Sequence, residues 1–543
     1  MSHAAPNQPV IPLDFAAMPR AELTDDGGRP LDAILCTTEH VAEAVRAAMR
    51  AGYAVMPAGG LTSAINSFAY DKAALAGRFR DVVAIRPKGA ITPEALPAAT
   101  PLSALLSHQY AIDRRRATIA VGAGITFTQA NALLAEAVAP DARVLIDPTS
   151  VGSASAGGVV ATGGMGPLRL PPSATLDAIC IAEGGEGGPR VLDGDAAAAH
   201  EGLQGWTGMV TAVRLRYFLV PPNEFGLVLP MQSSDIDGMA TLLAHLHPWT
   251  EIMLPAPGAR LAGDHPENTL LNGIELIGRD SLAQFAEHAA DPARTKALGL
   301  LQSCDYANAD LLACLTGWSN VPVDEVLGIL MDEDSETIGG VMIDFGVGFS
   351  SGGEMDAFRA IREGAPDIAR TRARVTPPGM LRPWSLSTDV NIAAPADSAA
   401  IAAVLTAYDD YRTAVADLAR SYAGRLDVSL SAYGHLSPRG IDPHHRVTII
   451  AAEGREAELE EARVAVGRLK KELIRDLLRA SESHACIVTG GEKGLPSVVE
   501  IVRAAGGDNR APDVLRRLAR SARTAVAKAP PAFTFRAPDD LAG

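Results

Sequence analysis

Two glycine-rich stretches about ninety residues apart constrain this chain more than any other feature. The first reads Pro-Ala-Gly-Gly-Leu-Thr-Ser over residues 57–63, and the second runs from Asp147 to Thr162. Glycine lets backbone N–H groups approach a pyrophosphate closely, and Ser and Thr hydroxyls can donate to the same oxygens. Both stretches lack a Walker lysine and a Gly-x-Gly-x-x-Gly sequence, which disfavours an ATPase and a nicotinamide-type Rossmann site.

The residues before the first stretch place it at the end of a strand. Apolar residues recur at helical spacing from Val41 onward, Thr38 is a residue type that caps helices, and Gly52 marks a helix end. The apolar run 53–56 then predicts a strand that leads into Pro57. Open α/β sheets hold ligands at the carboxyl ends of their strands, although an ordinary strand-to-loop turn fits this one stretch equally well.

Four motifs in a fixed order resemble the FAD-linked oxidase family, the flavoproteins with a vanillyl-alcohol-oxidase or PCMH-type FAD domain. Residues 57–63 are similar to that family's Pro-Arg-Gly-Gly-Gly-Thr-Ser loop, and residues 121–124 to its Val-Gly-Ala-Gly segment. Residues 147–162 resemble its second FAD segment, and residues 205–211 its Gly-Ile-Val-Thr strand. Within the family the chain looks like the D-2-hydroxyacid (D-lactate/glycolate) dehydrogenase branch. The likeness is good over residues 32–220 and weak beyond them.

The resemblance implies that these motifs bind FAD, the cofactor that accepts a hydride in this family. The cofactor-binding residues it implies are Pro57, Ala58, Gly59, Gly60, Leu61, Thr62, Ser63, Pro148, Thr149, Ser150, Gly157, Gly158, Ala161, Thr162, Gly208 and Val210.

The resemblance also implies an α+β fold, in which a PCMH-type FAD-binding domain of two α/β subdomains precedes a sheet-based substrate (cap) domain and C-terminal helices. A break at Pro221 and Pro222 separates these domains, and a charged amphipathic helix is predicted over 455–480. The units expected are an N-terminal arm at 1–30, the FAD-binding domain at 31–222, the cap domain at 223–505 and a C-terminal helical segment at 506–543.

Composition fits an enzyme of this kind. The 543 residues, 47% of them hydrophobic, are enough for two or three domains with large cores. A net charge of −16 disfavours a nucleic-acid partner. Five scattered cysteines indicate reduced thiols in a cytoplasmic protein. The first thirty residues lack a basic and apolar leader, and no run is apolar enough to span a membrane. We expect a cytoplasmic homo-oligomer, with peripheral attachment to the inner membrane left open.

The resemblance also suggests where the chemistry lies. Oxidising a 2-hydroxyacid requires a base or metal to take up the hydroxyl proton. The metal-dependent branch of the family uses Gly-His-x-Gly-Asp-Gly-Asn-x-His and Gly-Glu-His-Gly motifs, which residues 433–445 and 490–494 match in part. The match implies His435 and Glu492 as catalytic residues. His435, His444 and Glu492 become candidate ligands for zinc or manganese, with His445 as the other choice for the second histidine.

Two departures from the family pattern leave the base and the metal open. The second histidine comes later than in the family motif, so a longer loop is required, and Lys493 replaces the histidine that follows Glu492. A lysine is a poor proton acceptor unless burial lowers its pKa. Solvated loop histidines and an exposed Glu-Lys turn fit the same residues.

Arg382 is the residue that we expect to bind a substrate carboxylate. Residues 382–389 resemble the segment that enters the substrate site in this family, and an arginine fork can donate two hydrogen bonds to a carboxylate. A surface arginine fits the sequence as well. Trp206 and Trp384 are expected to be core residues.

The sequence therefore predicts an FAD-dependent dehydrogenase acting on a CH–OH donor, a small 2-hydroxyacid such as D-lactate, glycolate or 2-hydroxyglutarate. Its electrons would pass to a quinone, a cytochrome or another flavoprotein. Two alternatives stay open. One is a flavin-binding, non-catalytic subunit of an oxidoreductase complex, which Lys493 favours. The other is a phenol or alcohol oxidase of the same fold.

Overall fold

The computed structural model describes most of the chain. The residues described are 13–24, 30–59, 75, 77–89, 92–148, 154–166, 168, 170–186, 188–231, 235–287, 295, 299, 309–333, 336–342, 347–350, 352–372, 375–393, 396–437, 440–484, 486–490, 495–505 and 512–534. The predicted site residues that lie outside these ranges are Gly60, Leu61, Thr62, Ser63, Thr149, Ser150 and Glu492, together with Lys493.

A small sheet and the helix α1 form the first subdomain. Its strand order is β1-β2-β4-β3, with β1 antiparallel to β2 and the other pairs parallel. The bounds are Arg20–Thr24 for β1, Pro30–Thr38 for β2, Val41–Arg50 for α1, Ala54–Pro57 for β3 and Val82–Pro87 for β4.

The helix and strand predicted around Val41 and Pro57 are confirmed, but the helix cap is not the predicted one. His40 is the N-cap residue of α1 and makes no side-chain capping hydrogen bond. Thr38 lies too early to cap the helix, and its hydroxyl oxygen instead accepts the His40 N–H at 3.0 Å.

A second sheet forms the second subdomain, in the order β10-β9-β11-β7-β6-β5. Its helix α3 begins with a capping box, in which Thr126 and Gln129 exchange side-chain to backbone hydrogen bonds. The bounds are Glu94–Ala95 for β5, Leu102–Ala104 for the 3-10 helix η3, Gln109–Asp113 for β6, Thr118–Gly122 for β7, Phe127–Ala137 for α3, Ala156–Thr162 for α4, Leu176–Ala182 for β9, Arg190–Asp193 for β10, Gly194–Ala198 for α5 and Met209–Arg216 for β11, with β8 (Ala142–Arg143) paired to β12 (Phe218–Leu219) nearby.

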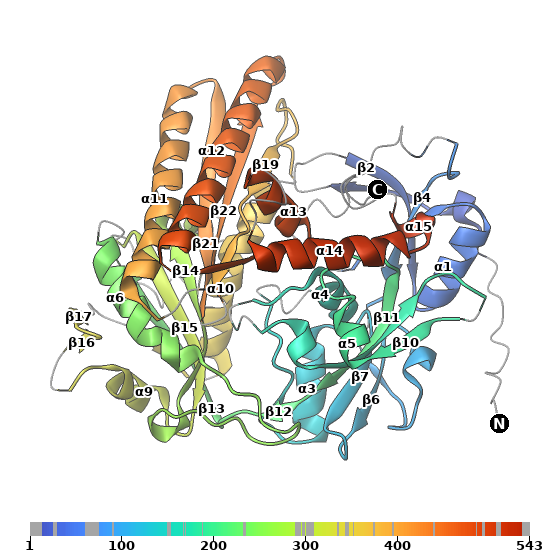
Figure 1. The fold of residues 1–543 in the computed structure, drawn as a ribbon, viewed down its shortest axis with the longest axis horizontal. Helices are drawn as coiled ribbons and strands as arrows, with labels where there is room; N and C mark the ends of the chain where they lie inside the picture. Colours follow the sequence, from blue (N-terminus) through green and yellow to red (C-terminus); the bar gives the residue numbers. More distant parts are fainter. Residues whose placement is uncertain are drawn as a thin grey trace.

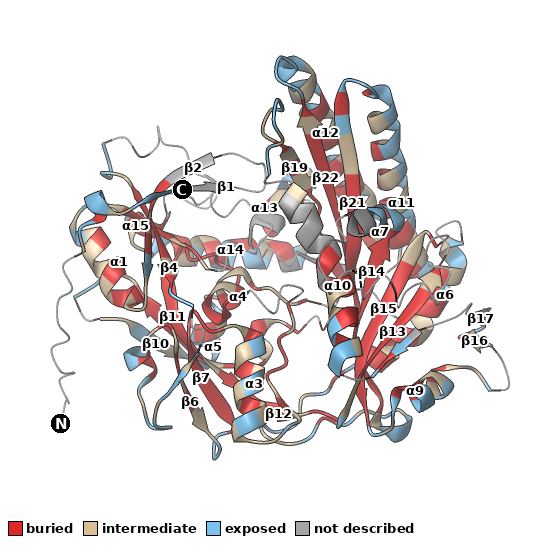
Figure 2. Ribbon diagram, turned by 180° about the vertical axis from the view of Figure 1, so that it is seen from behind, coloured by how far each residue is buried: buried red, intermediate tan, exposed pale blue. Residues whose placement is uncertain are grey.

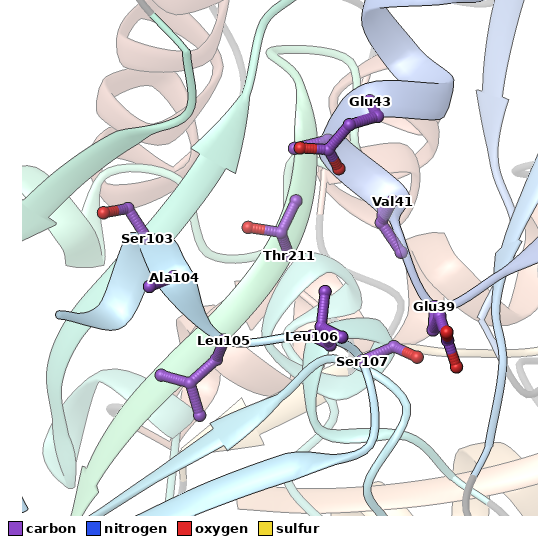
Figure 3. Close-up of a pocket in the computed structure, with 10 residues that line it drawn as sticks. Glu39, Val41, Glu43, Ser103, Ala104, Leu105, Leu106, Ser107 and Thr211 are labelled. Atoms are coloured by element: carbon purple, nitrogen blue, oxygen red, sulfur yellow. The ribbon is translucent and has the colours of Figure 1, made fainter. Parts of the chain in front are cut away.

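The two subdomains pack directly against each other at the start of α1. Figure 3 shows Thr211 of β11 between the segment 103–107 and the residues around Glu39. Ser107 joins the subdomains, because its hydroxyl donates to the Lys88 carbonyl at 2.7 Å and its N–H to the Glu39 carbonyl at 3.2 Å. The cavity at this point is about 20 Å³, room for roughly one water.

A larger sheet follows, in the order β18-β13-β15-β14-β21-β22-β20-β23, with β19 paired to β22. Its strands are β13 (Asn223–Met231), β14 (Leu270–Gly278), β15 (Leu311–Ser319), β18 (Val347–Phe349), β19 (Trp384–Ser387), β20 (Asn391–Ala393), β21 (Leu426–Ser437), β22 (Gly440–Ala451) and β23 (Ile487–Gly490). The helices after β13 are α6 (Ile236–Leu246), α7 (Arg279–Glu287), α9 (Val323–Leu330), α10 (Gly352–Arg372), α11 (Ser398–Ser421), α12 (Glu456–Ser483), α13 (Leu495–Ala504), α14 (Asp513–Ala527) and α15 (Pro531–Thr534).

The larger sheet has two chemically different faces. Paired residues in antiparallel strands project to the same side. Thus Leu430 with Val447, and Leu436 with Ile441, lie on a face that packs with α6, α11 and α12. Figures 1 and 2 show these helices on one side of the sheet, and α10 with the two N-terminal subdomains on the other.

The second face is polar where it belongs to β14, β19, β21 and β22. We call this region the polar face. The buried residues that define it are Glu275, Ser385, Ser387, Asp389, Ser431, His435, Asp442, His444 and Arg446. On β13 the same face is apolar, and α10 covers it. The Phe358 ring of α10 packs so closely on Gly226 of β13 that a Cβ at Gly226 would lie 2.8 Å from the ring. The polar face therefore continues the sheet surface on the side of the N-terminal subdomains.

The C-terminal helices return to the first subdomain (Figure 1). Phe533 of α15 is fully buried in a cluster with Phe15, Val45 and Ile85. Among the described residues, Cys36, Cys180, Cys314 and Cys486 form no disulfide, and burial raises the pKa of Cys36 to about 11. No described helix has the length and apolar character needed to cross a membrane.

A buried ion pair joins α10 to the second glycine-rich stretch. The Arg362 guanidinium donates to both carboxylate oxygens of Asp147, at 2.9 and 3.2 Å, and the Arg362 side chain is only 4% exposed. One helical turn away, Arg359 pairs with Glu224, but both of those side chains are more than a third exposed.

We expect Arg362→Met to destabilise the protein by roughly 3 kcal/mol, because it leaves the largely buried Asp147 carboxylate without its cation. Arg359→Met is the matched control on the same helix, with an expected loss below about 1 kcal/mol. Urea unfolding of both variants measures the difference. Equal losses would show that the Arg362 pair does not hold the domains together.

Candidate active site

The two glycine-rich stretches meet in the structure. Gly59 follows β3, and a Cβ placed on it would lie 3.1 Å from Ser155 Oγ and 3.3 Å from Gly158 Cα. Ser155 caps α4 by accepting the Gly158 N–H at 3.3 Å. The two backbones therefore approach as closely as glycine allows. We call the group Gly59, Ser155, Gly157 and Gly158 the glycine cradle.

The other two motifs join this cradle. A Cβ on Gly157 would lie 2.6 Å from Ala123 Cβ and 3.4 Å from the Val210 carbonyl oxygen. Gly205 has a positive φ of 71°, and a Cβ there would lie 2.7 Å from Pro57 Cγ. The segments 57–59, 121–124, 155–158 and 205–210 thus form one packed group, although they come from four separate parts of the chain.

The remaining described residues of the predicted FAD set lie around the cradle. The Thr162 hydroxyl donates to the Gly158 carbonyl at 2.9 Å, and the Ala161 carbonyl accepts the Gln204 N–H at 2.6 Å. Gly208 has a φ of 139°, next to Ile181. Ala58 donates its N–H to the Ile85 carbonyl at 2.9 Å, and Pro148 adjoins the paired Asp147.

On the polar face, His435 lies beside a fully buried carboxylate. Glu275 Oε2 is 3.5 Å from His435 Nδ1, and the two side chains are 0% and 1% exposed. Within the described part of the chain, the Glu275 oxygens accept no hydrogen bond. His435 Nδ1 therefore faces the carboxylate in a solvent-free setting.

His444 lies next to His435 and to two further carboxylates. The two imidazole centroids are 5.2 Å apart. His444 Nδ1 is 3.7 Å from Asp389 Oδ1 and 3.8 Å from Asp442 Oδ1, and the possible ligand atoms of these three residues all lie within 4.8 Å of one another. A histidine with two carboxylates at this spacing is a donor set that suits zinc or manganese.

The structure decides between the two candidate second histidines. His445 projects to the opposite, helix-covered face, where its ring lies 4.9 Å from that of Tyr408. Burial, followed by the charges of His444 and Arg412, lowers the pKa of His445 to about 3, so that imidazole is neutral. His444 is therefore the histidine that joins His435.

Sequence reasoning missed Glu275, Asp389 and Asp442 as members of the site. Asp442 is the direct cross-strand partner of His435 in the β21–β22 hairpin. The signal available was the alternation of polar residues at 442, 444, 446 and 448, which predicts a strand with one polar face.

Arg446 is a further missed residue. It is 1% exposed on the polar face, two positions from His444, and its Nη1 donates to Ser385 Oγ at 3.2 Å. The predicted carboxylate ligand Arg382 lies two residues before β19 and is partly buried, and its Nε makes no hydrogen bond to any described residue. Both arginines border β19, but only Arg446 is placed on the polar face by strand pairing.

No family model and no curated protein matches the chain. Solved structures do match it. An alkyldihydroxyacetonephosphate synthase is 15% identical with a TM-score of 0.52, over 84% of this chain and 75% of that one. GilR, an oxidoreductase that catalyses the terminal step of gilvocarcin biosynthesis, is 13% identical with a TM-score of 0.51, over 94% of this chain and 95% of that one.

The chain shares the fold of these two proteins. The likeness to GilR extends over nearly the whole of both chains, so it includes the two α/β subdomains, the larger sheet and the C-terminal helices. The predicted α+β architecture, two α/β subdomains followed by a larger sheet and C-terminal helices, is confirmed.

Proposed function

We propose that this chain is an FAD-dependent oxidoreductase that oxidises a small 2-hydroxyacid. The observation that carries the proposal is the convergence of the four glycine-containing motifs into one cradle, on the side of the larger sheet that bears the polar face. A fold shared with GilR, itself an oxidoreductase, supports the same conclusion.

The glycine cradle fits a pyrophosphate-containing cofactor. Gly59, Gly157 and Gly158 leave the backbone bare where side chains would otherwise fill the contact between the loops. Glycine backbone without side chains lets a pyrophosphate approach closely. FAD bound there would supply the hydride acceptor that the reaction needs.

The polar face supplies the groups that the substrate needs. The Arg446 guanidinium would hold the carboxylate through a two-pronged hydrogen bond, with Arg382 as the second candidate for that role. The His435 imidazole would take the hydroxyl proton as the C–H hydride departs, with Glu275 stabilising the imidazolium that forms. His444, Asp389 and Asp442 would hold a divalent zinc or manganese ion that lowers the pKa of the hydroxyl.

The test is anaerobic bleaching of the purified yellow protein by a panel of D- and L-2-hydroxyacids, before and after dialysis against EDTA. We expect one D-acid to bleach the flavin, and zinc or manganese to restore any rate that EDTA removes. His435→Gln should slow bleaching by about 10²- to 10⁴-fold while the flavin content is unchanged.

The other outcomes separate the alternatives. A yellow protein that no acid bleaches would favour a non-catalytic flavin subunit or an oxidase for phenols or alcohols. A colourless protein without affinity for FAD would reject the whole proposal. Rapid bleaching that EDTA does not slow would retain the dehydrogenase and reject the metal. The electron acceptor is then identified by adding a quinone, a cytochrome or a flavoprotein to the bleached protein. The natural class of acceptor is the one that reoxidises the flavin.

A further inference from the structure

A second cavity lies on the opposite face of the larger sheet from the polar face. It has a volume of about 180 Å³ and is bounded by α6, α11, the end of β14 and the β21–β22 hairpin. Much of its lining is apolar, including Ile236, Met239, Leu276, Leu405, Ala432 and Pro443. A dry cavity of about 150 Å³ is large enough for benzene, so this one can hold a single small ring.

Four of the five charged groups that border the cavity form two ion pairs. Arg279 lies 3.3 Å from Asp310, and Arg412 lies 2.7 Å from Asp409. Asp280 also borders the cavity, and burial raises its pKa. Two arginines and three aspartates give no surplus of positive charge for an anionic ligand. The surroundings therefore favour an uncharged ligand over a carboxylate.

His445 and the Tyr408 hydroxyl are buried polar groups in the lining of the cavity. His445 is 7% exposed, and among the described residues its Nδ1 has no hydrogen-bond partner. The Tyr408 and Tyr411 rings lie 4.9 and 6.1 Å from the imidazole centroid. A buried nitrogen without a partner is unfavourable, and a hydroxyl group on a bound ligand would satisfy it.

We propose that this cavity is a second binding site, for a small uncharged aromatic alcohol of the phenol class. The ring would pack against Met239, Leu276 and Leu405, and the hydroxyl would hydrogen-bond with His445. The size, the apolar lining and the buried polar groups each match that chemistry.

The wall of this cavity also belongs to the strand that carries His444. The His445 N–H donates to Thr388 Oγ1 at 2.8 Å, and the Thr388 N–H donates to the His445 carbonyl at 2.9 Å. Thr388 precedes Asp389, which lies beside His444 on the polar face. A ligand held at His445 would therefore fix the backbone behind His444 and Asp389. An effect on substrate oxidation rests on the proposed function, whereas binding itself does not.

Phenol is the probe, with benzoate and benzylamine as charged analogues and toluene as the analogue without a hydroxyl group. Binding is measured by isothermal titration of the flavin-loaded protein, and located through the ¹³C-methyl NMR signal of Met239. We expect phenol to shift that signal and to bind at least tenfold more tightly than benzoate or benzylamine. His445→Leu should weaken phenol at least tenfold while toluene binding is retained.

A matched pair of variants ties the binding to the cavity. Ile236→Trp places an indole at the cavity wall and should abolish phenol binding, whereas Asp237→Trp adds the same group at an exposed neighbour outside the lining and should leave binding unchanged. Any one of three results would overturn the proposal. They are equal phenol affinity in the two variants, tight binding of benzoate, and no shift of the Met239 signal at millimolar phenol. Since no hydroxyacid is present, failure here leaves the bleaching test unaffected.

Discussion

Gly158→Val protein is expected to purify with little or no flavin. A Cβ at position 158 lies 3.0 Å from Ser155 Oγ and 3.7 Å from Gly59 Cα, so the two γ-methyl groups of valine would occupy the contact between the two glycine-rich stretches. Overpacking of this kind costs about 1–3 kcal/mol, which corresponds to roughly 5- to 150-fold weaker FAD binding.

The absorbance of bound flavin relative to protein, followed by FAD titration of the apoprotein, measures this effect. Gly467→Val is the matched control, since Gly467 also lies inside a helix, α12, but a Cβ there meets no atom within 4 Å. Both variants carry the same helix penalty for a β-branched residue. If the Gly158→Val variant retains as much flavin as the Gly467→Val variant, the cradle does not hold the cofactor. Gly158→Ala, with no γ-methyl groups, should fall between them.

Arg446→Lys is expected to lower kcat/KM for the hydroxyacid by about 10- to 150-fold, the loss that corresponds to one charge-assisted hydrogen bond of about 1.5–3 kcal/mol. Lysine keeps the positive charge next to the carboxylates of the polar face but lacks the planar fork that binds a carboxylate through two hydrogen bonds. The flavin content should remain normal, because Arg446 lies on the larger sheet and not in the glycine cradle.

Arg382→Lys is the comparison that assigns the carboxylate ligand. Arg446 is 1% exposed on the polar face, whereas Arg382 is only partly buried, before β19. We expect the Arg382 variant to change kcat/KM by less than the Arg446 variant. The reverse order in steady-state kinetics on the same acid would restore Arg382 as the residue that binds the carboxylate, and a large loss in both would assign them a shared role.

Local sequence patterns predicted the secondary structure around the cofactor motifs well. The apolar spacing from Val41 predicted α1, and the apolar run 53–56 predicted β3, which spans Ala54–Pro57. The charged amphipathic stretch beginning at Arg455 predicted α12, which spans Glu456–Ser483. These features depend on near neighbours in the chain, so they can be recognised without knowing the partner elements. The predicted helix cap was wrong, because α1 begins after His40 and not directly after Thr38.

The cofactor motifs were recognisable because each glycine is required where it stands. A side chain at Gly157 would overlap Ala123, and one at Gly59 would press against Ser155. That requirement restricts the residue type at the position itself, so it is visible in the sequence even though the contacting segments are distant. Trp206, 2% exposed, was likewise placed correctly in the core from its residue type.

The sequence by itself determined the fold class and the glycine motifs, together with the histidines of the hairpin. Only the tertiary structure decided which of these side chains share a site. His444 and His445 are neighbours in sequence but lie on opposite faces of β22, and the pairing of Tyr433 with His444 and of Ala432 with His445 sets which face each takes. Glu275 meets His435 because β14 pairs with β21, and Asp389 reaches His444 from the segment after β19. The register between strands far apart in the chain depends on the burial of whole faces, which no local pattern contains.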